Sequence, residues 1–532
     1  MRKRALRYIS AVTAVILMAI ACQSPVSNIK RTVTPVSSWL EEMTISRLLE
    51  GYKEKKYSVT DVVKAYLDRI NEIDMSGPEL NSIIMVNPDA LAIAKELDRD
   101  IEEGKMRGPL HGVPVILKDN IDTGDNMPTT GGSNALAVSF AGSDSFIAGK
   151  LREAGAVILG KANLSEWANF RAERSSSGWS GVGGQTKNPY ILDRNPCGSS
   201  SGSGVAVSAN LCMVAIGTET NGSIVCPSNN NGIVGIKPTV GLLSRTGIIP
   251  ISFTQDTPGP MARKVEDAVI CLGALTGIDP SDLKTTGSEG KYLNDYSKYL
   301  VADGLKGKRI GLIKNSGGYF DRVDSLMFGA VRDIQAAGAE IIEVEAPAGR
   351  EYNGHSYQVL LYEFRDGLNK YLAGLGDKAP VRNLEALIAF NINDSIELKH
   401  FDQKIFIKAE SKGDLNSPEY LNALEKMHKA TRENGIDKIM NSNRLDALIA
   451  PTGGPAWKTD LILGDHFTGG SSSLAAVAGY PAITVPMGFI NELPVGITFF
   501  GRAWSEPVLI EAAYGYEQAT RHRKPPRYLI TD

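Results

Sequence analysis

The sequence contains few cysteines and histidines and almost no excess of charge. Among 532 residues there are 5 Cys and 6 His, and 57 basic residues stand against 60 acidic ones. No C-x-x-C pair and no His at ligand spacing occurs, which argues against a zinc site. The near balance of charge, without basic clusters interleaved with aromatic residues, argues against a nucleic-acid surface. We therefore expect neither a metal nor a nucleic-acid partner.

The cysteines are too widely spaced to define a pairing. They are Cys22, Cys197, Cys212, Cys226 and Cys271. Disulfides are possible in an exported protein, but nothing in this spacing demands them. We expect the last four to be buried free thiols.

A long apolar run is also missing at the N-terminus. A basic start is followed by an apolar run of roughly a dozen residues from Ala11, too short for a comfortable membrane span. Small Ala21 then precedes Cys22, which resembles a bacterial lipobox, where the cysteine is lipidated. We predict that 1–22 is a signal whose Cys22 anchors an exported protein to a bacterial membrane, and that 23–37 is a tether. A cleaved signal and an uncleaved anchor are the alternatives.

The rest of the chain has the composition and periodicity of a layered globular domain. Hydrophobic residues make up 42% and charged residues 22%. Helical periodicity fills residues 39–101, where "SVTD" is a plausible helix start, and 112–117 is a short apolar run typical of a strand. Residues 144–161 indicate helix, turn and strand. Such alternation favours an α/β domain, with a variable, mostly helical region at about 350–440.

The most unusual stretch is "PCGSSSGSG" at 196–204. An apolar run follows it at once, which argues against a flexible linker. No lysine follows in the manner of a P-loop, so only a backbone phosphate nest stays conceivable. The stretch also fits G-x-S-x-G with Ser200 as nucleophile, and His466 is a possible partner for it. A Ser-His-Asp esterase is therefore one hypothesis.

Other motifs surround this stretch in a fixed order. They are "GPLHGVPVILKDNID" (108–122), "GTETNGSIVCPSNNNGIVGIKPTVGLLSRTG" (217–247), "QDTPGPMARKVEDA" (255–268) and "AGYPAITVPMG" (478–488). Together they closely resemble the amidase signature family, over most of the chain from about 40 to 520. The resemblance implies the amidase signature fold for residues 38–525, with α/β/α layers around a mixed β-sheet. It also implies a serine amidase that needs no cofactor.

The same resemblance implies a Ser-Ser-Lys triad. Carried over motif by motif, Lys118 is the family's lysine and Ser223 its nucleophile. Ser199, which stands 24 positions before Ser223, matches the bridging serine, usually held by a cis peptide bond. The oxyanion hole would consist of the backbone N–H groups of Thr220, Asn221, Gly222 and Ser223.

This assignment is chemically reasonable without the family. A serine hydroxyl needs a base to take its proton, and lysine serves only when burial lowers its pKa enough to leave it neutral. A second hydroxyl can relay the proton because it both donates and accepts. Spacing alone does not choose among Lys118, Lys161 and Lys237, and any of them could be a surface lysine with its stem on apolar surface. The resemblance selects Lys118.

Departures from the common family form T-D-T-G-G-S-I-R point to one branch. Glu219, Asn221 and Val225 replace its Asp, first Gly and Arg. Asparagine tolerates positive φ, so the backbone N–H of Asn221 could still contribute to the oxyanion hole. With "KANLSEWANFR" (161–171) and "SGWSGVGGQTKNPY" (177–190), the sequence resembles the peptide amidase branch, which removes the amide from peptide C-termini. Val225 and the signal argue against the tRNA-dependent amidotransferase branch.

We therefore expect hydrolysis of a primary carboxamide, on peptide C-termini, to an acid and ammonia. Small aliphatic or aryl amides and amino acid amides are alternative substrates, and a non-catalytic lipoprotein that binds amides or peptides is an alternative of another class. A near-repeat of the serine-rich stretch, "GGSSSLAAVAG" at 469–479, lacks a following T-x-T-x-G-S. We expect its serines to line a pocket wall or cap a helix.

Overall fold

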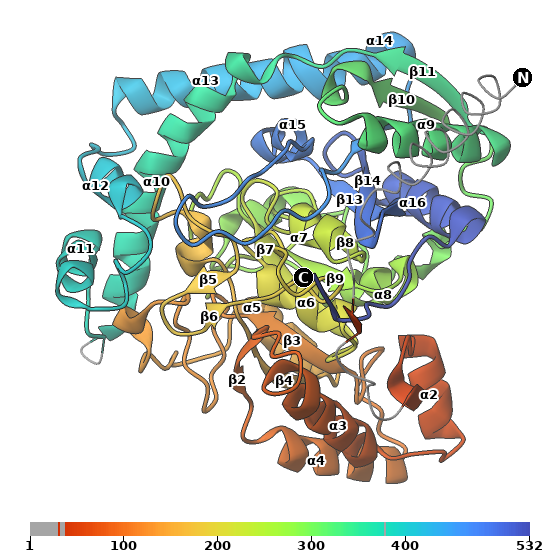
Figure 1. Ribbon diagram of the computed structural model, residues 1–532, viewed down its shortest axis with the longest axis vertical. Helices are drawn as coiled ribbons and strands as arrows, with labels where there is room; N and C mark the ends of the chain where they lie inside the picture. The colour runs from red at the N-terminus through yellow and green to blue at the C-terminus, as the bar shows by residue number, and fades with distance from the viewer. Residues whose placement is uncertain (1–29, 32–37, 377–378, 532) are drawn as a thin grey trace, which may run out of the picture.

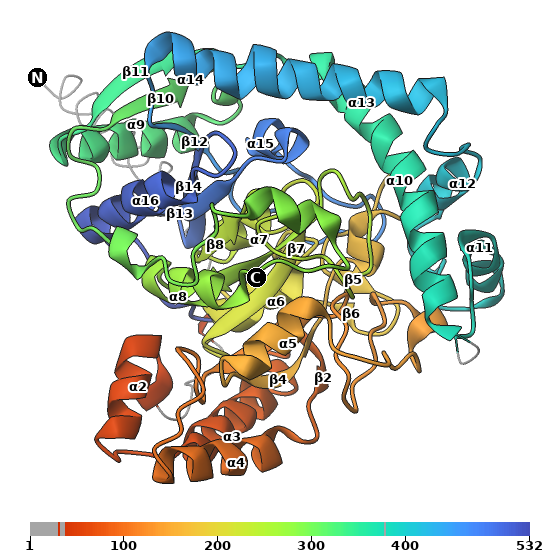
Figure 2. The same ribbon diagram turned by 180° about the vertical axis from the view of Figure 1, so that it is seen from behind.

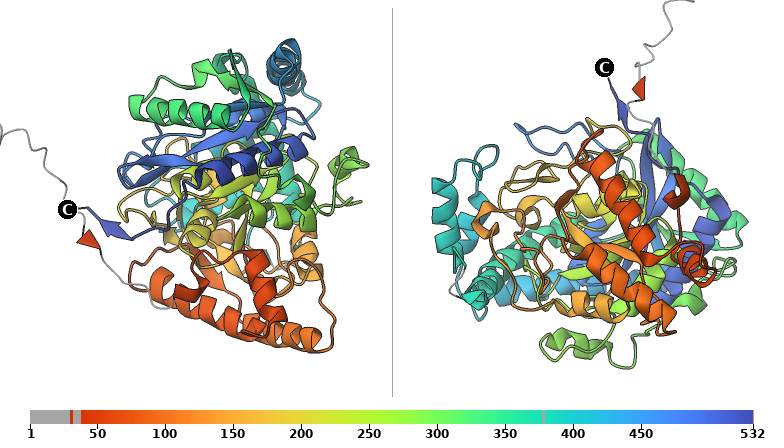
Figure 3. Two further views of the ribbon diagram at one scale, coloured as in Figure 1. Left: turned by 90° about the vertical axis from the view of Figure 1, so that its right-hand side faces the viewer. Right: turned by 90° about the horizontal axis from the view of Figure 1, so that it is seen from below.

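The computed structural model describes residues 30–31, 38–376 and 379–531 (Figure 1). The predicted signal 1–22 lies outside these residues, and only 30–31 of the predicted tether 23–37 lie within them. Within the described ranges, no helix is both long and apolar enough to cross a membrane. The strand β1 (Lys30–Arg31) pairs with β15 (Leu529–Ile530), and Figure 3 shows the two side by side.

A mixed sheet of eleven strands forms the centre of the molecule, in the order β11-β10-β12-β14-β13-β8-β9-β7-β3-β4-β2. These strands are β2 (Ile83–Val86), β3 (Pro114–Lys118), β4 (Val157–Ala162), β7 (Val214–Glu219), β8 (Val234–Lys237), β9 (Thr257–Ala262), β10 (Arg309–Ile313), β11 (Glu340–Val344), β12 (Ala447–Pro451), β13 (Ala482–Ile490) and β14 (Leu493–Phe500). A two-stranded sheet joins β5 (Trp179–Ser180) to β6 (Gly184–Gln185).

Helices cover both faces of this sheet. They are α2 (Ile45–Lys53), α3 (Val59–Arg69), α4 (Ala90–Glu102), α5 (Phe146–Glu153), α6 (Ser201–Ser208), α7 (Val225–Asn230), α8 (Val265–Leu275), α9 (Asp321–Ala336), α10 (Asn353–Gly374), α11 (Leu384–Asn393), α12 (Lys404–Glu410), α13 (Pro418–Thr431), α14 (Asp437–Asn443), α15 (Ser472–Ala478) and α16 (Glu506–Thr520). In Figure 2, α9, α16, α8 and α5 lie one after another in one layer. The predicted α/β/α arrangement around a mixed sheet is confirmed.

The connections between three parallel strands change direction at the carboxyl ends of β3 and β7. Strands β3, β4 and β7 are parallel, and β3 lies between the other two. The chain passes from β3 through α5 outward to β4, then returns through α6 to β7. Because such crossovers are right-handed, the opposite directions place α5 and α6 on opposite faces. The carboxyl ends of β3 and β7 therefore meet where open α/β sheets commonly bind ligands.

Local signals account for several elements. Helix α3 begins after Ser58, whose side chain accepts from the N–H of Asp61 while the Asp61 carboxylate accepts from the N–H of Ser58. This reciprocal capping box is the predicted start at "SVTD".

The expectation of helix throughout 39–101 was wrong at one place, because β2 (Ile83–Val86) interrupts it. Its short apolar run, with two adjacent isoleucines, pairs with the edge of β4, so tertiary pairing overrides the helical pattern.

A helical arm made of α10 to α13 curves along the left and upper side of the molecule in Figure 1. Its first three helices bury an apolar cluster that includes Leu361, Phe364 and Phe406. The cluster also contains Trp167 and Ile249 from loops beside the central sheet. The arm therefore packs against loops that lie near the carboxyl ends of β3 and β7.

Candidate active site

Lys118 is the last residue of β3, and its side chain is completely buried. Its Nζ lies 2.8 Å from Ser199 Oγ, 2.8 Å from Thr218 Oγ1 and 3.2 Å from the carbonyl oxygen of Thr218. Burial lowers the pKa of Lys118 to about 7, and the negative charges of Asp256 and Glu219 oppose this shift only in part. A substantial fraction of the lysine is therefore neutral near neutral pH.

The partners of Lys118 suit a neutral amine. Such an amine has two N–H donors and one lone pair. The carbonyl oxygen of Thr218 can only accept a hydrogen bond, so it takes one N–H. When Thr218 Oγ1 takes the other, the lone pair is left for the hydroxyl of Ser199, which can then donate its proton. Asn120 Nδ2, at 3.0 Å, also donates to Thr218 Oγ1 and holds this hydroxyl in place.

Ser199 and Ser200 lie between the central sheet and the start of α6. The peptide bond between Gly198 and Ser199 is cis, as the resemblance implied. Ser200 is fully buried; its Oγ donates to the carbonyl oxygen of Thr218 at 3.1 Å and accepts from the Thr218 N–H at 3.2 Å. The Ser200 hydroxyl thus both donates and accepts a hydrogen bond, and these two bonds hold the start of α6 against β7.

His466 does not supply the base that an esterase would need at Ser200. Its Nε2 lies 3.0 Å from Asp460 Oδ2, and about half of its side chain is exposed. Among the described residues, no hydrogen bond joins Ser200 to any histidine. The G-x-S-x-G pattern therefore has a structural explanation here, since both hydrogen-bonding functions of Ser200 serve the packing of α6.

The segment 220–223 links the end of β7 to α7. At its start the Glu219 carboxylate accepts from the backbone N–H groups of Ile224 and Val225, at 2.7 and 3.1 Å. This carboxylate satisfies donors at the first turn of α7, which have no partner inside the helix. Glu219, which replaces the family's Asp, therefore closes the segment into a tight loop.

Carbonyl groups of this segment are hydrogen-bonded, whereas its backbone N–H groups and the Ser223 hydroxyl stay available among the described residues. The carbonyl oxygen of Ser223 accepts from the Ser200 N–H at 3.1 Å, which brings the segment against the start of α6. Among the hydrogen bonds of the described residues, none involves Ser223 Oγ and none is donated by the backbone N–H of residues 220–223. Gly222 adopts the left-handed conformation, with φ of 84°, and Asn221 does not. Ser223 itself is half-buried.

The other two candidate lysines are also buried, contrary to the surface alternative. Lys161 Nζ donates to the carbonyl oxygen of Ile121 at 2.6 Å and to Thr129 Oγ1 at 2.9 Å. Lys237 Nζ donates to the carbonyl oxygen of Tyr480 at 2.6 Å, and burial lowers its pKa to about 8. Within the part of the chain that is described, Lys118 is the one of the three that hydrogen-bonds to a serine of the 196–204 stretch.

A disulfide joins Cys197 to Cys226, so the expectation of free thiols was wrong for this pair. The cysteines are 29 positions apart, and the turn from β7 into α7 brings the second back beside the first. The disulfide therefore ties the serine-rich stretch to the segment around Ser223. For Cys212 and Cys271 the expectation is confirmed, because both are buried free thiols.

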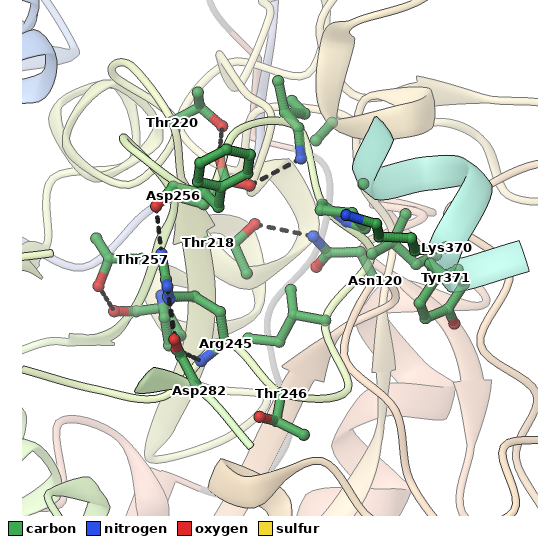
Figure 4. Close-up of a pocket in the computed structure, with 18 of the residues that line it drawn as sticks. Asn120, Thr218, Thr220, Arg245, Thr246, Asp256, Thr257, Asp282, Lys370 and Tyr371 are labelled. Carbon is green, nitrogen blue, oxygen red and sulfur yellow. Dashed lines mark hydrogen bonds and ion pairs between the residues drawn. The ribbon is translucent and has the colours of Figure 1, made fainter. Parts of the chain in front are cut away.

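A cavity of about 450 Å³ lies beside the carboxyl end of β7 (Figure 4). Thr218 and Thr220 connect it to the site, while Lys118, Ser199 and Ser223 are not part of its wall. Figure 4 shows Lys370 and Tyr371 of α10 beside Asn120, and the ion pair of Arg245 and Asp282 on the lower side. The apolar part of the wall comes mainly from residues 248–251 and 253. The variable region thus contributes to the cavity.

Two residues of this arrangement, Thr218 and Asn120, were missed in the sequence. Both lie within the family motifs, two positions before Thr220 and two after Lys118. Their contact depends on the parallel pairing of β3 with β7, in which Leu117 stands opposite Ile216. Only that register brings the Thr218 side chain to Lys118.

Comparison with known proteins agrees with this fold. The family profile described as "Amidase" matches residues 61–510. A protein of Arabidopsis thaliana called "Probable amidase" is 41% identical over 502 residues, which cover 92% of each chain. A subunit of the glutamyl-tRNA(Gln) amidotransferase of Carboxydothermus hydrogenoformans is 33% identical, with 91% of this chain and 98% of that chain covered.

A solved structure is more similar still. The native peptide amidase from Stenotrophomonas maltophilia is 48% identical, with a TM-score of 0.88, and the match covers 92% of this chain and 99% of that chain. The fold and these matches define a hydrolase of amide C–N bonds. The chain belongs to the amidase signature family.

Proposed function

We propose that the protein hydrolyses the C-terminal amide of peptides to a free acid and ammonia through a Ser-Ser-Lys mechanism. The observation that carries the mechanism is the hydrogen bond between the buried amine of Lys118 and the hydroxyl of Ser199. A lysine with its pKa near 7 in this place is a base of suitable strength. Ser199 then relays the proton of the nucleophile Ser223.

In the first half of the proposed reaction, Ser223 Oγ forms a bond to the amide carbon. Its proton passes to Ser199 Oγ, while the proton of Ser199 passes to Lys118 Nζ. The carbonyl oxygen becomes an oxyanion, which the free N–H groups of residues 220–223 stabilise by about 3–4 kcal/mol for each effective donor. The C–N bond then breaks, and the proton returns through Ser199 to the leaving nitrogen, which departs as ammonia.

In the second half, water attacks the ester formed on Ser223. Its proton follows the same path to Lys118, and a second tetrahedral oxyanion forms. When the C–O bond to Ser223 breaks, the relay returns the proton to the serine oxygen. The products are the peptide acid and the free enzyme, so atoms and protons balance without a cofactor.

The proposal of a peptide substrate rests on the similarity to the peptide amidase of Stenotrophomonas maltophilia and on the branch motifs of the sequence. Val225 in place of the arginine of the common form argues against the tRNA-dependent amidotransferase branch. Ser223 is half-buried and Asn221 is exposed, so the site has access to solvent.

A screen of ammonia release tests the substrate class. We expect kcat/KM for C-terminally amidated dipeptides to exceed that for amino acid amides and aryl amides by at least about tenfold, since extra binding contacts act on the transition state. The same dipeptides with free carboxylates serve as the blank. A preference for aryl amides would contradict the peptide assignment, and binding without any turnover would favour the non-catalytic alternative.

We also propose export and lipidation at Cys22. The disulfide between Cys197 and Cys226 supports an oxidising compartment, where such bonds persist. In cells fed labelled palmitate, the full-length protein should carry the label and Cys22→Ser should not. Equal labelling of both proteins, or labelling of neither, would contradict the anchor.

A further inference from the structure

The side chain of Asn221 joins the segment 220–223 to the serine-rich segment 469–479. Ser472 Oγ donates to Asn221 Oδ1 at 2.8 Å, and Asn221 Nδ2 donates to Ser473 Oγ at 3.2 Å. These serines lie 251 and 252 positions further along the chain. The serines of this segment were expected to line a pocket wall or cap a helix; Ser471 stands at the N-cap position of α15, but its side chain makes no capping hydrogen bond.

We propose that Asn221 and Ser472 are positioning residues, which hold the backbone N–H groups of the segment 220–223 in the geometry that stabilises the oxyanion. This inference rests on the proposed function of that segment. Backbone donors accelerate a reaction to the extent that they are already oriented when charge develops. A loop that had to rearrange at that moment would lose part of the benefit.

Among the described residues, hydrogen bonds hold both ends of the segment but not the peptide unit between Asn221 and Gly222. The carbonyl oxygen of Thr220 accepts from Gln255 Nε2 at 3.3 Å, and that of Gly222 accepts from the N–H of Cys226 at 2.8 Å. At its beginning, Thr220 Oγ1 donates to Asp256 Oδ1 at 2.6 Å, and at its end the carbonyl oxygen of Ser223 accepts from Ser200. Between these points lie Gly222 and the exposed Asn221. Glycine at φ of 84° has unusual conformational freedom, so the orientation of the peptide unit between Asn221 and Gly222 depends on what the Asn221 side chain contacts.

The chemistry and position of the contact match this role. A carboxamide offers an acceptor and donors on one rigid group. Its oxygen accepts from Ser472 and its nitrogen donates to Ser473, whose Oγ also lies 3.4 Å from the carboxamide oxygen. Ser472 lies close over Gly222, because a Cβ built on that glycine would stand 3.0 Å from Ser472 Oγ. A glycine at position 221, as in the common family form, could make neither hydrogen bond. The near-repeat at 469–479 thus acquires a role that depends on asparagine at position 221.

Kinetics of Ser472→Ala and Asn221→Gly test the inference. Each variant should lower kcat for the preferred amide by about tenfold and change KM by less than about twofold, because the contact acts on the oxyanion rather than on substrate binding. Binding of a peptide aldehyde, whose serine adduct places an oxyanion in the hole, should weaken by about the same factor as kcat. Ser472→Thr, which keeps the hydroxyl, should recover most of the lost kcat.

A double-mutant cycle and a matched control separate positioning from general damage. The variant carrying both changes should be no slower than the slower single variant, because both remove the same interaction. Ser471→Ala is the control, because Ser471 Oγ donates to the carbonyl oxygen of Pro451 at 2.7 Å and, among the described residues, is not hydrogen-bonded to Asn221. Its kcat should stay within about twofold of wild type.

Three outcomes would overturn the inference: unchanged kcat and aldehyde affinity in Ser472→Ala, strictly additive effects in the double variant, or an equal loss in Ser471→Ala. Failure of the proposed function looks different. In that case Ser223→Ala would keep its activity, whereas an inactive Ser223→Ala together with a normal Ser472→Ala would reject the positioning role alone. If none of the tested amides is hydrolysed, the affinity of the peptide aldehyde for wild type and for Ser472→Ala alone tests the positioning role.

Discussion

Replacement of Ser223 by alanine should abolish ammonia release, with kcat falling by about 10⁴-fold or more. No neighbouring serine can take over the attack. The hydroxyl of Ser199 is engaged with Lys118, and that of Ser200 is buried and paired with Thr218 on both its donor and acceptor sides. Ammonia release from the preferred amide under saturating conditions measures the loss.

The folded state should barely respond to the same change. No hydrogen bond of the described residues uses Ser223 Oγ, so the melting temperature of Ser223→Ala should stay within about 2 °C of wild type. A fluorophosphonate should label wild type at Ser223 and leave the variant unlabelled. Undiminished ammonia release from the variant, or a label found on Ser200, would reject the triad.

Replacement of Lys118 by methionine should lower kcat/KM by about 10³-fold or more. Methionine fills much of the same buried space but cannot accept a proton, so Ser199 loses the group to which it passes one. Lys237→Met is the matched control, because Lys237 is also buried and has a lowered pKa but donates to the carbonyl oxygens of Tyr480 and Pro238. The control should lose about 1–3 kcal/mol of stability through the unpaired carbonyls, with kcat within about threefold of wild type.

The pH dependence of the wild-type protein gives a second test of the same lysine. Below a pKa of about 7 the protonated amine has no lone pair, and above it the neutral amine accepts the proton of Ser199. The value of kcat/KM should therefore rise with pH through about 7 and level off above it, and the residual activity of Lys118→Met should lack this rise. Higher activity at pH 5 than at pH 8, or a loss in Lys237→Met as large as in Lys118→Met, would contradict the role of Lys118.

Motifs that are contiguous in the chain allowed the fold and the site residues to be predicted with little further information. The alternation of helix and strand patterns indicated an α/β domain, and the motif order identified the family. The resemblance of "PCGSSSGSG" and "TETNGSI" to the family motifs, with an agreeing separation, selected Ser199 and Ser223 as the predicted relay and nucleophile. The capping box at Ser58 and Asp61 could be predicted for the same reason, since its hydrogen bonds connect residues three positions apart.

Contacts between distant segments could not be predicted, because no local pattern encodes them. Three lysines follow or lie within apolar runs, and only the parallel register of β3 and β7 places Lys118 against Thr218. The disulfide of Cys197 and Cys226 depends on the turn after β7, and two widely spaced cysteines carry no sign of it.

By itself the sequence determined the class of fold, the family and the residues proposed for the reaction, since these reside in short motifs and in local periodicity. The tertiary structure alone decided how the site is held. It buries the amine of Lys118 and so lowers its pKa, pairs Ser200 with Thr218, and brings Ser472 to Asn221 across 251 positions of chain. Burial and long-range hydrogen bonds arise only when the sheet assembles, because they depend on which strands become neighbours.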